Sequence, residues 1–200
     1  MDPGTLPSIA RGNPDCRVIV PRAELNHAES LGIGKDRLTG LAAGQSLPLP
    51  GGGAVEALPS AHETLAVNEN GDHLHLGYVL TLGALRLYHS GDCVPYEGLE
   101  KALRMRHIDG ALLPINGRSA YLGARGIAGN FTLEEAVELC RGAGIPVLMC
   151  HHFGMFAFNT VDREEAARRI AGLDVKCVLP EVDKLYLLRA PESDRAEPPL

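Results

Sequence analysis

The chain has 200 residues, of which 45% are hydrophobic and only 4% aromatic, with no tryptophan. This length suits one domain with an aliphatic core. The formal net charge of −6 argues against nonspecific binding of nucleic acid, which favours clustered lysine and arginine.

The sequence has no features typical of a membrane or secreted protein. No apolar run reaches the ~18 residues that span a bilayer, and the N-terminus lacks the basic and apolar regions of a secretory signal. The five cysteines are scattered without a CxxC pair: Cys16, Cys93, Cys140, Cys150 and Cys177. An odd set of this kind favours reduced thiols. We therefore expect a cytoplasmic protein with no membrane or nucleic-acid partner.

Short β-type runs alternate with helical patterns along the chain. The first part predicts strands at 17–21, 54–58, 74–81 and 84–88, a helix at 22–31, and a loop or hairpin at 44–53. The second part predicts helices at 99–106, 132–140 and 162–172, and strands at 110–115, 145–149, 175–179 and 184–188. Thr132 and Glu135 have the spacing of a capping box. The pattern indicates an α/β protein with mixed sheets, comprising one domain at 1–190 and a disordered, proline-rich tail at 191–200.

Three potential metal ligands follow predicted strands. His62 comes after the strand at 54–58, Asp92 after the strand at 84–88, and His152 after the strand at 145–149. Sites on α/β scaffolds gather at strand ends, where loops carry polar groups on a rigid frame. Two imidazoles and one carboxylate suit zinc, manganese or iron. Taken singly, each has an ordinary structural explanation, since a histidine beside a strand is common and Ser-Gly-Asp favours a turn.

Several motifs in order carry a resemblance to a known superfamily. The strings SAHE (60–63), HSGD (89–92) and HHFGMF (151–156) resemble the later metal motifs of the metallo-β-lactamase superfamily. Further strings resemble its L-ascorbate-6-phosphate lactonase-like branch: HLGYV (75–79), YHSGDCVPYEGL (88–99), ALLPINGR (111–118), GNFTLEEA (129–136) and HHFGMFAFNT (151–160). The resemblance covers nearly the whole chain except the tail and implies part of an αββα sandwich.

The resemblance implies a role for each ligand. His62 is similar to the histidine that binds the first metal, Asp92 to the carboxylate that bridges both, and His152 to the histidine of the second metal. His151 is the alternative to His152. Two divalent ions, zinc or manganese, would activate water against a small ester or lactone, such as a phosphorylated sugar-acid lactone. Asp92 would thus act in catalysis through the bridged metals.

The sequence departs from the family in one large respect. The family's HxHxDH motif, which supplies two ligands to each metal, is absent. Met1 stands where the residue after that motif belongs, so the resemblance implies a truncated chain with an incomplete first sheet. Each metal would keep one histidine plus Asp92, against the three protein ligands usual at catalytic zinc. We therefore expect weak metal binding, no turnover, and self-association through an unpaired sheet edge.

Other polar residues have two interpretations each. Asn116 and Arg118 follow the strand at 110–115 and are expected to bind the small-molecule substrate, although Asn-Gly also makes a plain turn with a solvated arginine. His89 is expected to orient Asp92 or a metal-bound group. His73 and His75 share one strand face and are more simply structural, with metal binding as the alternative.

Two other functions compete with a hydrolase. The first is a non-catalytic fragment or degenerate copy that binds a partner through an exposed sheet edge. The second is an RNA-processing nuclease of the same superfamily, against which the acidic charge and the lack of a basic insertion both argue.

Overall fold

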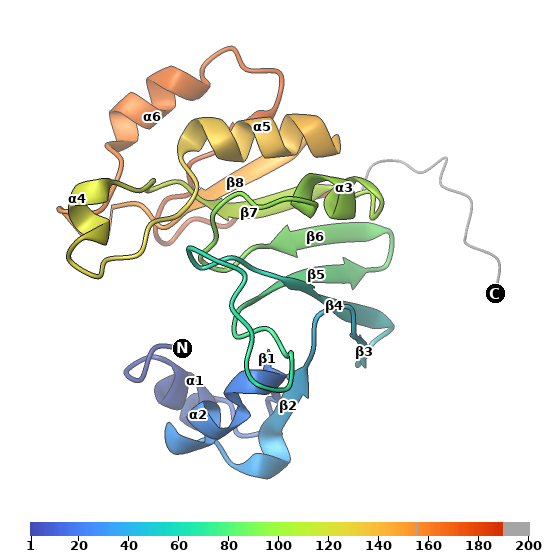
Figure 1. The fold of residues 1–200 in the computed structure, drawn as a ribbon. Coiled ribbons are helices and arrows are strands. Elements are labelled where there is room, and N and C mark those ends of the chain that lie inside the picture. The colour runs from blue at the N-terminus through green and yellow to red at the C-terminus, as the bar shows by residue number, and fades with distance from the viewer. Residues whose placement is uncertain (155, 190–200) are drawn as a thin grey trace.

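The computed structural model describes residues 1–154 and 156–189, so the predicted tail lies outside the described residues. The strands form a two-stranded sheet and a seven-stranded sheet. In Figure 1, the large sheet runs through the middle of the molecule, with helices above it and the N-terminal segment below. Mixed strand directions and helices packed on sheets confirm the predicted α/β class.

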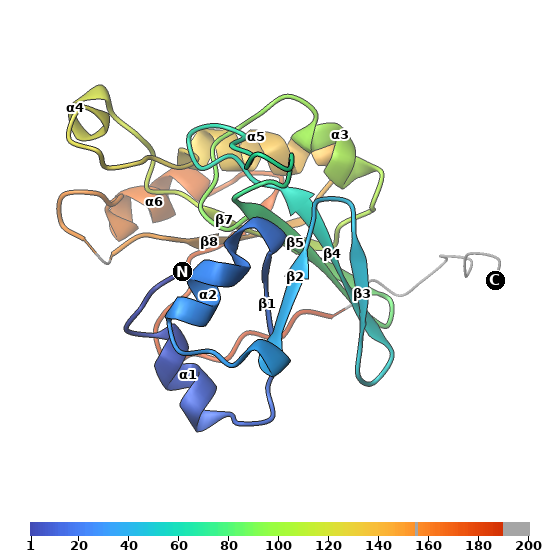
Figure 2. The same ribbon diagram turned by 60° about the horizontal axis from the view of Figure 1, so that its bottom comes forward.

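The N-terminal segment is a small parallel unit that lies against the large sheet (Figures 1 and 2). Its two paired strands are β1 (Val18–Pro21) and β2 (Leu38–Leu41). Two α-helices, α1 (Leu6–Gly12) and α2 (Leu25–Ser30), accompany the 3-10 turns η1 (Arg22–Glu24) and η2 (Lys35–Arg37). Parallel pairing requires a crossover, which η1, α2 and η2 provide.

The large sheet keeps its strands in sequence order. These are β3 (Ser46–Leu49), β4 (Gly53–Pro59), β5 (Leu76–Leu82), β6 (Leu85–His89), β7 (Gly110–Pro114), β8 (Val147–His151) and β9 (Lys176–Val178). Neighbours from β3 to β6 are antiparallel, and neighbours from β6 to β9 are parallel.

Helices follow the parallel strands. They are α3 (Leu99–Arg104), α4 (Ala120–Gly123), α5 (Leu133–Ala143) and α6 (Arg163–Ile170), and Figure 1 shows α3, α5 and α6 above the large sheet. The predicted capping box of α5 is confirmed, because Thr132 accepts from the Glu135 amide while Glu135 accepts from the Thr132 amide. Gly144 ends α5 at a φ of 72°, a left-handed conformation that suits glycine.

The two faces of the large sheet bury separate apolar clusters. On β5, Val79 belongs to the core beneath the helices, whereas Tyr78 and Leu80 pack with the other core. That second core also holds Leu41 and Ile19 from the N-terminal unit. Alternation along a strand produces this division, because successive side chains point to opposite faces.

Strand direction decides where polar loops meet. Because β4 and β6 are both antiparallel to β5, they run the same way, and β7 and β8 are parallel to β6. The C-terminal ends of β4, β6, β7 and β8, together with the start of β5, therefore lie along one edge. All the predicted ligand loops leave the sheet at this edge.

The clearest differences between the sequence-based predictions and the structure concern β8, the run at 184–188 and three short elements. Strand β8 begins and ends two residues later than expected, so His151 is its last residue rather than part of the loop. The predicted strand at 184–188 is wrong, because these residues adopt no regular structure and Leu185 and Leu187 are 87% and 77% exposed. No described strand pairs with that segment. The short elements α1, β2 and α4 were not predicted, since four to seven residues carry little periodicity.

Among the described residues, none of the helices has the length and apolar character that crossing a membrane would require.

Gly77 provides a test of the sheet packing. A Cβ at this position would lie 2.8 Å from the Oη and 2.9 Å from the Cε2 of Tyr88, whose side chain is fully buried. We expect Gly77→Ala to lower the free energy of unfolding by about 1–3 kcal/mol, because the Tyr88 ring must move within a packed core. Urea denaturation measures this change.

Gly12→Ala is the matched control, because a Cβ on this α1 residue meets nothing within 4 Å. Its unfolding free energy should stay within about 0.5 kcal/mol of the parent. Equal stabilities for the Gly77 and Gly12 variants would contradict this packing.

Candidate functional site

A buried serine joins the loops that carry two predicted ligands. The Ser60 side chain is 2% exposed, and its Oγ donates to the carbonyl of Ser90 at 2.8 Å and to that of Asp92 at 3.3 Å. Its backbone amide donates to the carbonyl of His75 at 3.0 Å. Ser60 therefore holds the end of β4, the start of β5 and the loop after β6 together. Sequence reasoning missed Ser60, whose only signal is a small polar residue between Pro59 and an apolar alanine.

The structure brings two of the predicted ligands into contact. The Nε2 of His152 lies 3.3 Å from the Oδ2 of Asp92. The His152 side chain is 23% exposed and the Asp92 side chain 44% exposed, so solvent reaches the pair. The backbone of His152 has a φ of 57°, a left-handed conformation uncommon outside glycine. Such a strained residue persists only where its surroundings hold it, which is frequent at functional sites.

His151 lies apart from this contact. Its ring centre is 4.8 Å from that of His89, and its Nε2 is buried without a hydrogen-bond partner in the described part of the chain. Burial, with the charge of His89 as the second cause, lowers the pKa of His151 from 6.5 to about 4. The geometry thus places His152, not His151, against Asp92.

His89 acts on the Asp92 loop through the backbone. The amide of Gly91 donates to the Nδ1 of His89 at 2.9 Å. This bond fixes the chain one residue before Asp92, which agrees with an orienting role for His89. That role stays a prediction.

The remaining predicted ligand, His62, faces His75. Their ring centres are 5.0 Å apart, with the planes inclined at 44°. Both line a cavity of about 520 Å³ that also includes Asp92, Ser60 and Met1. Burial, followed by the charge of His62, lowers the pKa of His75, which favours neutral imidazole with a lone pair available.

The predicted ligands have the right chemistry for a divalent ion, but their observed contacts join only two side chains at a time. His152 contacts Asp92, and His62 faces His75. Imidazole nitrogen and carboxylate oxygen are ordinary ligands of zinc, manganese and iron. Across residues 1–154 and 156–189, however, no three histidine, cysteine, aspartate or glutamate side chains are placed together to hold a metal. The residues as they stand therefore do not form a complete coordination set.

The predicted substrate-binding residues are engaged within the protein. Arg118 donates from its two Nη atoms to both carboxylate oxygens of Glu135, at 2.6 and 2.5 Å. Asn116 donates to the Oδ1 of Asn159 and accepts from the Nδ2 of Asn130, both at 3.0 Å. This amide chain connects the loops after β7 and β8. Substrate binding by Arg118 requires its Glu135 partner to share or release it, and it stays a prediction.

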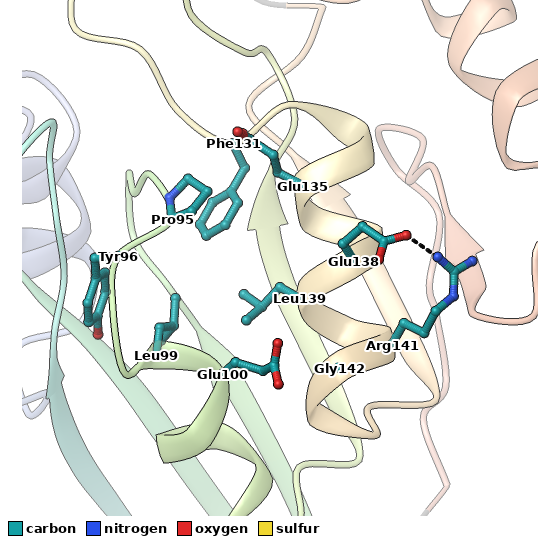
Figure 3. A pocket seen from close by; sticks show the side chains of 10 residues that line it. All are labelled: Pro95, Tyr96, Leu99, Glu100, Phe131, Glu135, Glu138, Leu139, Arg141 and Gly142. Carbon is teal, nitrogen blue, oxygen red and sulfur yellow. Dashed lines mark hydrogen bonds and ion pairs between the residues drawn. The ribbon is translucent and has the colours of Figure 1, made fainter.

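A second hollow lies between α3 and α5, away from the histidines. Figure 3 shows apolar side chains, Leu99, Leu139 and Phe131, lining it beside several glutamates. The cavity measures about 460 Å³, and the dashed ion pair in the figure joins Glu138 and Arg141. It contains no histidine and no aspartate. We place the candidate site at the cavity lined by His62, His75 and Asp92, because strand ends converge there and the ligand chemistry is present.

Comparisons with solved structures support the fold. Igni18, a metallo hydrolase from Ignicoccus hospitalis, matches 87% of this chain and 69% of its own length with a TM-score of 0.65 and 18% identity. An isothiocyanate hydrolase from Delia radicum gut bacteria matches 86% and 66% (TM-score 0.66, 14% identity). The metallo-beta-lactamase fold protein YhfI from Bacillus subtilis matches 88% and 67% (TM-score 0.62, 15% identity). The chain spans about two thirds of the length of these structures.

A comparison with curated protein sequences gives no match. The family described as beta-lactamase superfamily domain matches residues 4–153, which is well over half of the chain and includes every predicted ligand. The chain therefore belongs to the beta-lactamase superfamily domain family.

Proposed function

We propose that this chain carries part of the site of a metal-dependent hydrolase that acts on a small ester or lactone, a phosphorylated sugar-acid lactone being the preferred class. His62, Asp92 and His152 are its proposed metal ligands. The 3.3 Å contact between His152 and Asp92, at a sheet edge that also carries His62, is the observation that supports this assignment. The family membership agrees with it.

The chemistry of the site suits hydrolysis of a polar substrate. A divalent ion supplies positive charge that polarises a carbonyl or phosphoryl oxygen. Asn116 and Arg118, at the end of the neighbouring strand β7, offer amide and guanidinium groups for a sugar hydroxyl and a phosphate or carboxylate. The bidentate pair with Glu135 holds the Arg118 guanidinium in a fixed plane before any substrate arrives.

His62, Asp92 and His152 supply too few ligands for two metals by themselves. With Asp92 shared, each ion would have two protein ligands against the three usual at catalytic zinc. The HxHxDH motif that would complete the set is absent from the sequence. We propose that the 200-residue chain, which lacks this motif, does not hydrolyse lactones or esters.

A second candidate is a non-catalytic domain of the same family. The observation that favours it is the lack, in the described part of the chain, of any three potential ligands placed together. Metal titration separates the two candidates. A hydrolase site loses zinc affinity when Asp92 is replaced, whereas a non-catalytic domain does not depend on Asp92 as a metal ligand.

Asp92→Asn tests the metal assignment. We expect the neutral amide to weaken zinc binding by more than ~10-fold, since a lost ligand costs at least as much as a lost supporting hydrogen bond. Competition with a coloured chelator measures the affinity. Asp36→Asn, an exposed residue of η2, is the control and should bind as the parent does. Equal zinc affinity in both variants would contradict the assignment.

Turnover by the 200-residue chain is measured separately on a panel of lactones and esters with zinc or manganese. We expect no rate above the metal-only blank. A metal-dependent rate that Asp92→Asn abolishes would show that the chain is active without the motif.

The lowered pKa of His151 predicts how the free energy of unfolding changes with pH. Its pKa is about 4 in the folded chain, against 6.5 in the absence of burial. Between these values the unfolded chain binds a proton that the folded chain does not, so stability falls as the pH falls from 6.5 towards 4. In the presence of a chelator, we expect His151→Gln to flatten this dependence in urea denaturation. An unchanged pH dependence in the variant would mean that other groups cause it.

A further inference from the structure

The loop after β7 carries α4 and closes on itself at its base. The amide of Gly117 donates to the carbonyl of Phe131, and the amide of Asn130 donates to the carbonyl of Gly117, both at 2.9 Å. A Cβ on Gly129 would lie 2.0 Å from the Cβ of Arg118, so glycine allows the two ends of the loop to approach this closely. Compact loops whose ends meet are frequently functional. In Figure 1, α4 projects at the left, the side toward which β6 points.

A cavity of about 380 Å³ lies between this loop and the loops that carry two proposed ligands. The loop after β4 contributes Glu63, which follows His62 directly, and the loop after β6 contributes Val94, two residues beyond Asp92. The volume is within the ~300–1,000 Å³ that is usual for small-molecule pockets. The cavity therefore adjoins the candidate site and begins one residue from a proposed metal ligand.

The two charged side chains that line this cavity are not paired with each other. Arg118 uses three of its five N–H groups on Glu135 and on the carbonyl of Asn130, so two remain for a ligand. The exposed Glu63 carboxylate has no hydrogen bond or ion pair within residues 1–154 and 156–189. The backbone of Glu63 has a φ of 69°, a conformation that is uncommon outside glycine and persists where the surroundings hold it.

Hydroxyl groups suit this pair of charges better than an ion does. A hydroxyl both donates and accepts, so adjacent hydroxyls donate to the Glu63 carboxylate and accept from the Arg118 guanidinium. An ammonium ion would be repelled by Arg118, and an anion would be repelled by Glu63. The aliphatic part of the wall, which includes Val94, Ala120 and Ile127, suits the C–H groups of a carbon chain.

We propose that this cavity is a subsite for the hydroxylated carbon chain of the substrate, and that Glu63 selects for adjacent hydroxyl groups. Glu63 accepts hydrogen bonds from them, and Arg118 donates while it stays paired with Glu135. The proposal rests on the proposed function for the reaction that the substrate undergoes. The hydroxyl contacts themselves need no metal, so they are measured apart from metal binding.

Sorbitol, a linear polyol, titrated into the chelator-treated 200-residue chain tests this proposal by NMR. We expect saturable shifts of the amide signals of Glu63 and Gly129. Glu63→Gln should weaken sorbitol binding by about 10-fold, because hydrogen bonds to a charged acceptor are stronger than those to a neutral one. A diol of the same chain length, with hydroxyls only at its two ends, should give no saturable shift.

Glu69→Gln is the matched control, because Glu69 is also exposed and lies in the same segment between β4 and β5 but does not line the cavity. It should bind sorbitol as the parent does. Glutamine keeps the size of the glutamate side chain, and the amide spectrum of each variant shows whether it folds.

The outcomes are distinguishable from those of the zinc experiment. Equal sorbitol affinity in the parent and Glu63→Gln would overturn the role of Glu63. A parent that gives no saturable shift, or that binds the terminal diol equally well, would overturn the subsite while the metal assignment stands on Asp92→Asn. If zinc binding proves independent of Asp92 while sorbitol binding depends on Glu63, the subsite stands and the proposed function falls.

Discussion

The direction of the strands in the large sheet is the constraint on which the site depends. β4, β6, β7 and β8 end at the same edge, and β5 begins there. Reversing one strand would move its loop to the opposite end of a sheet about five residues long. The antiparallel β5 makes β4 and β6 run alike, and this arrangement brings His62 and Asp92 to one cavity although 30 positions separate them in the sequence.

Hydrogen bonds between loops then fix the site at that edge. The Ser60 hydroxyl, buried between the β4 and β6 loops, donates to the main-chain carbonyls of Ser90 and Asp92, and burial of the Ser90 bond makes its loss costly. The amides of Asn116, Asn130 and Asn159 make a similar connection between the loops after β7 and β8. The predicted site residues are therefore flanked by polar side chains whose hydrogen bonds hold the loop backbones in place.

The local sequence patterns were sufficient for most of the elements. The capping box of Thr132 and Glu135, the alternation along β5 and the buried run of β7 each depend on residues a few positions apart. The apolar run at 184–188 forms no strand, because a strand needs a hydrogen-bonded partner and no described strand pairs with this segment. The exposed Leu185 and Leu187 show that an apolar run alone does not produce pairing.

By itself the sequence determined the α/β class, the family resemblance and the positions of His62, Asp92 and His152 after strands, because these follow from local periodicity and motif order. Only the tertiary structure decided which donors meet. It placed His152 rather than His151 at Asp92, paired His62 with His75, and bound Arg118 to Glu135. These contacts join residues 13 to 60 positions apart, and strand register and loop packing, which no local pattern encodes, bring them together.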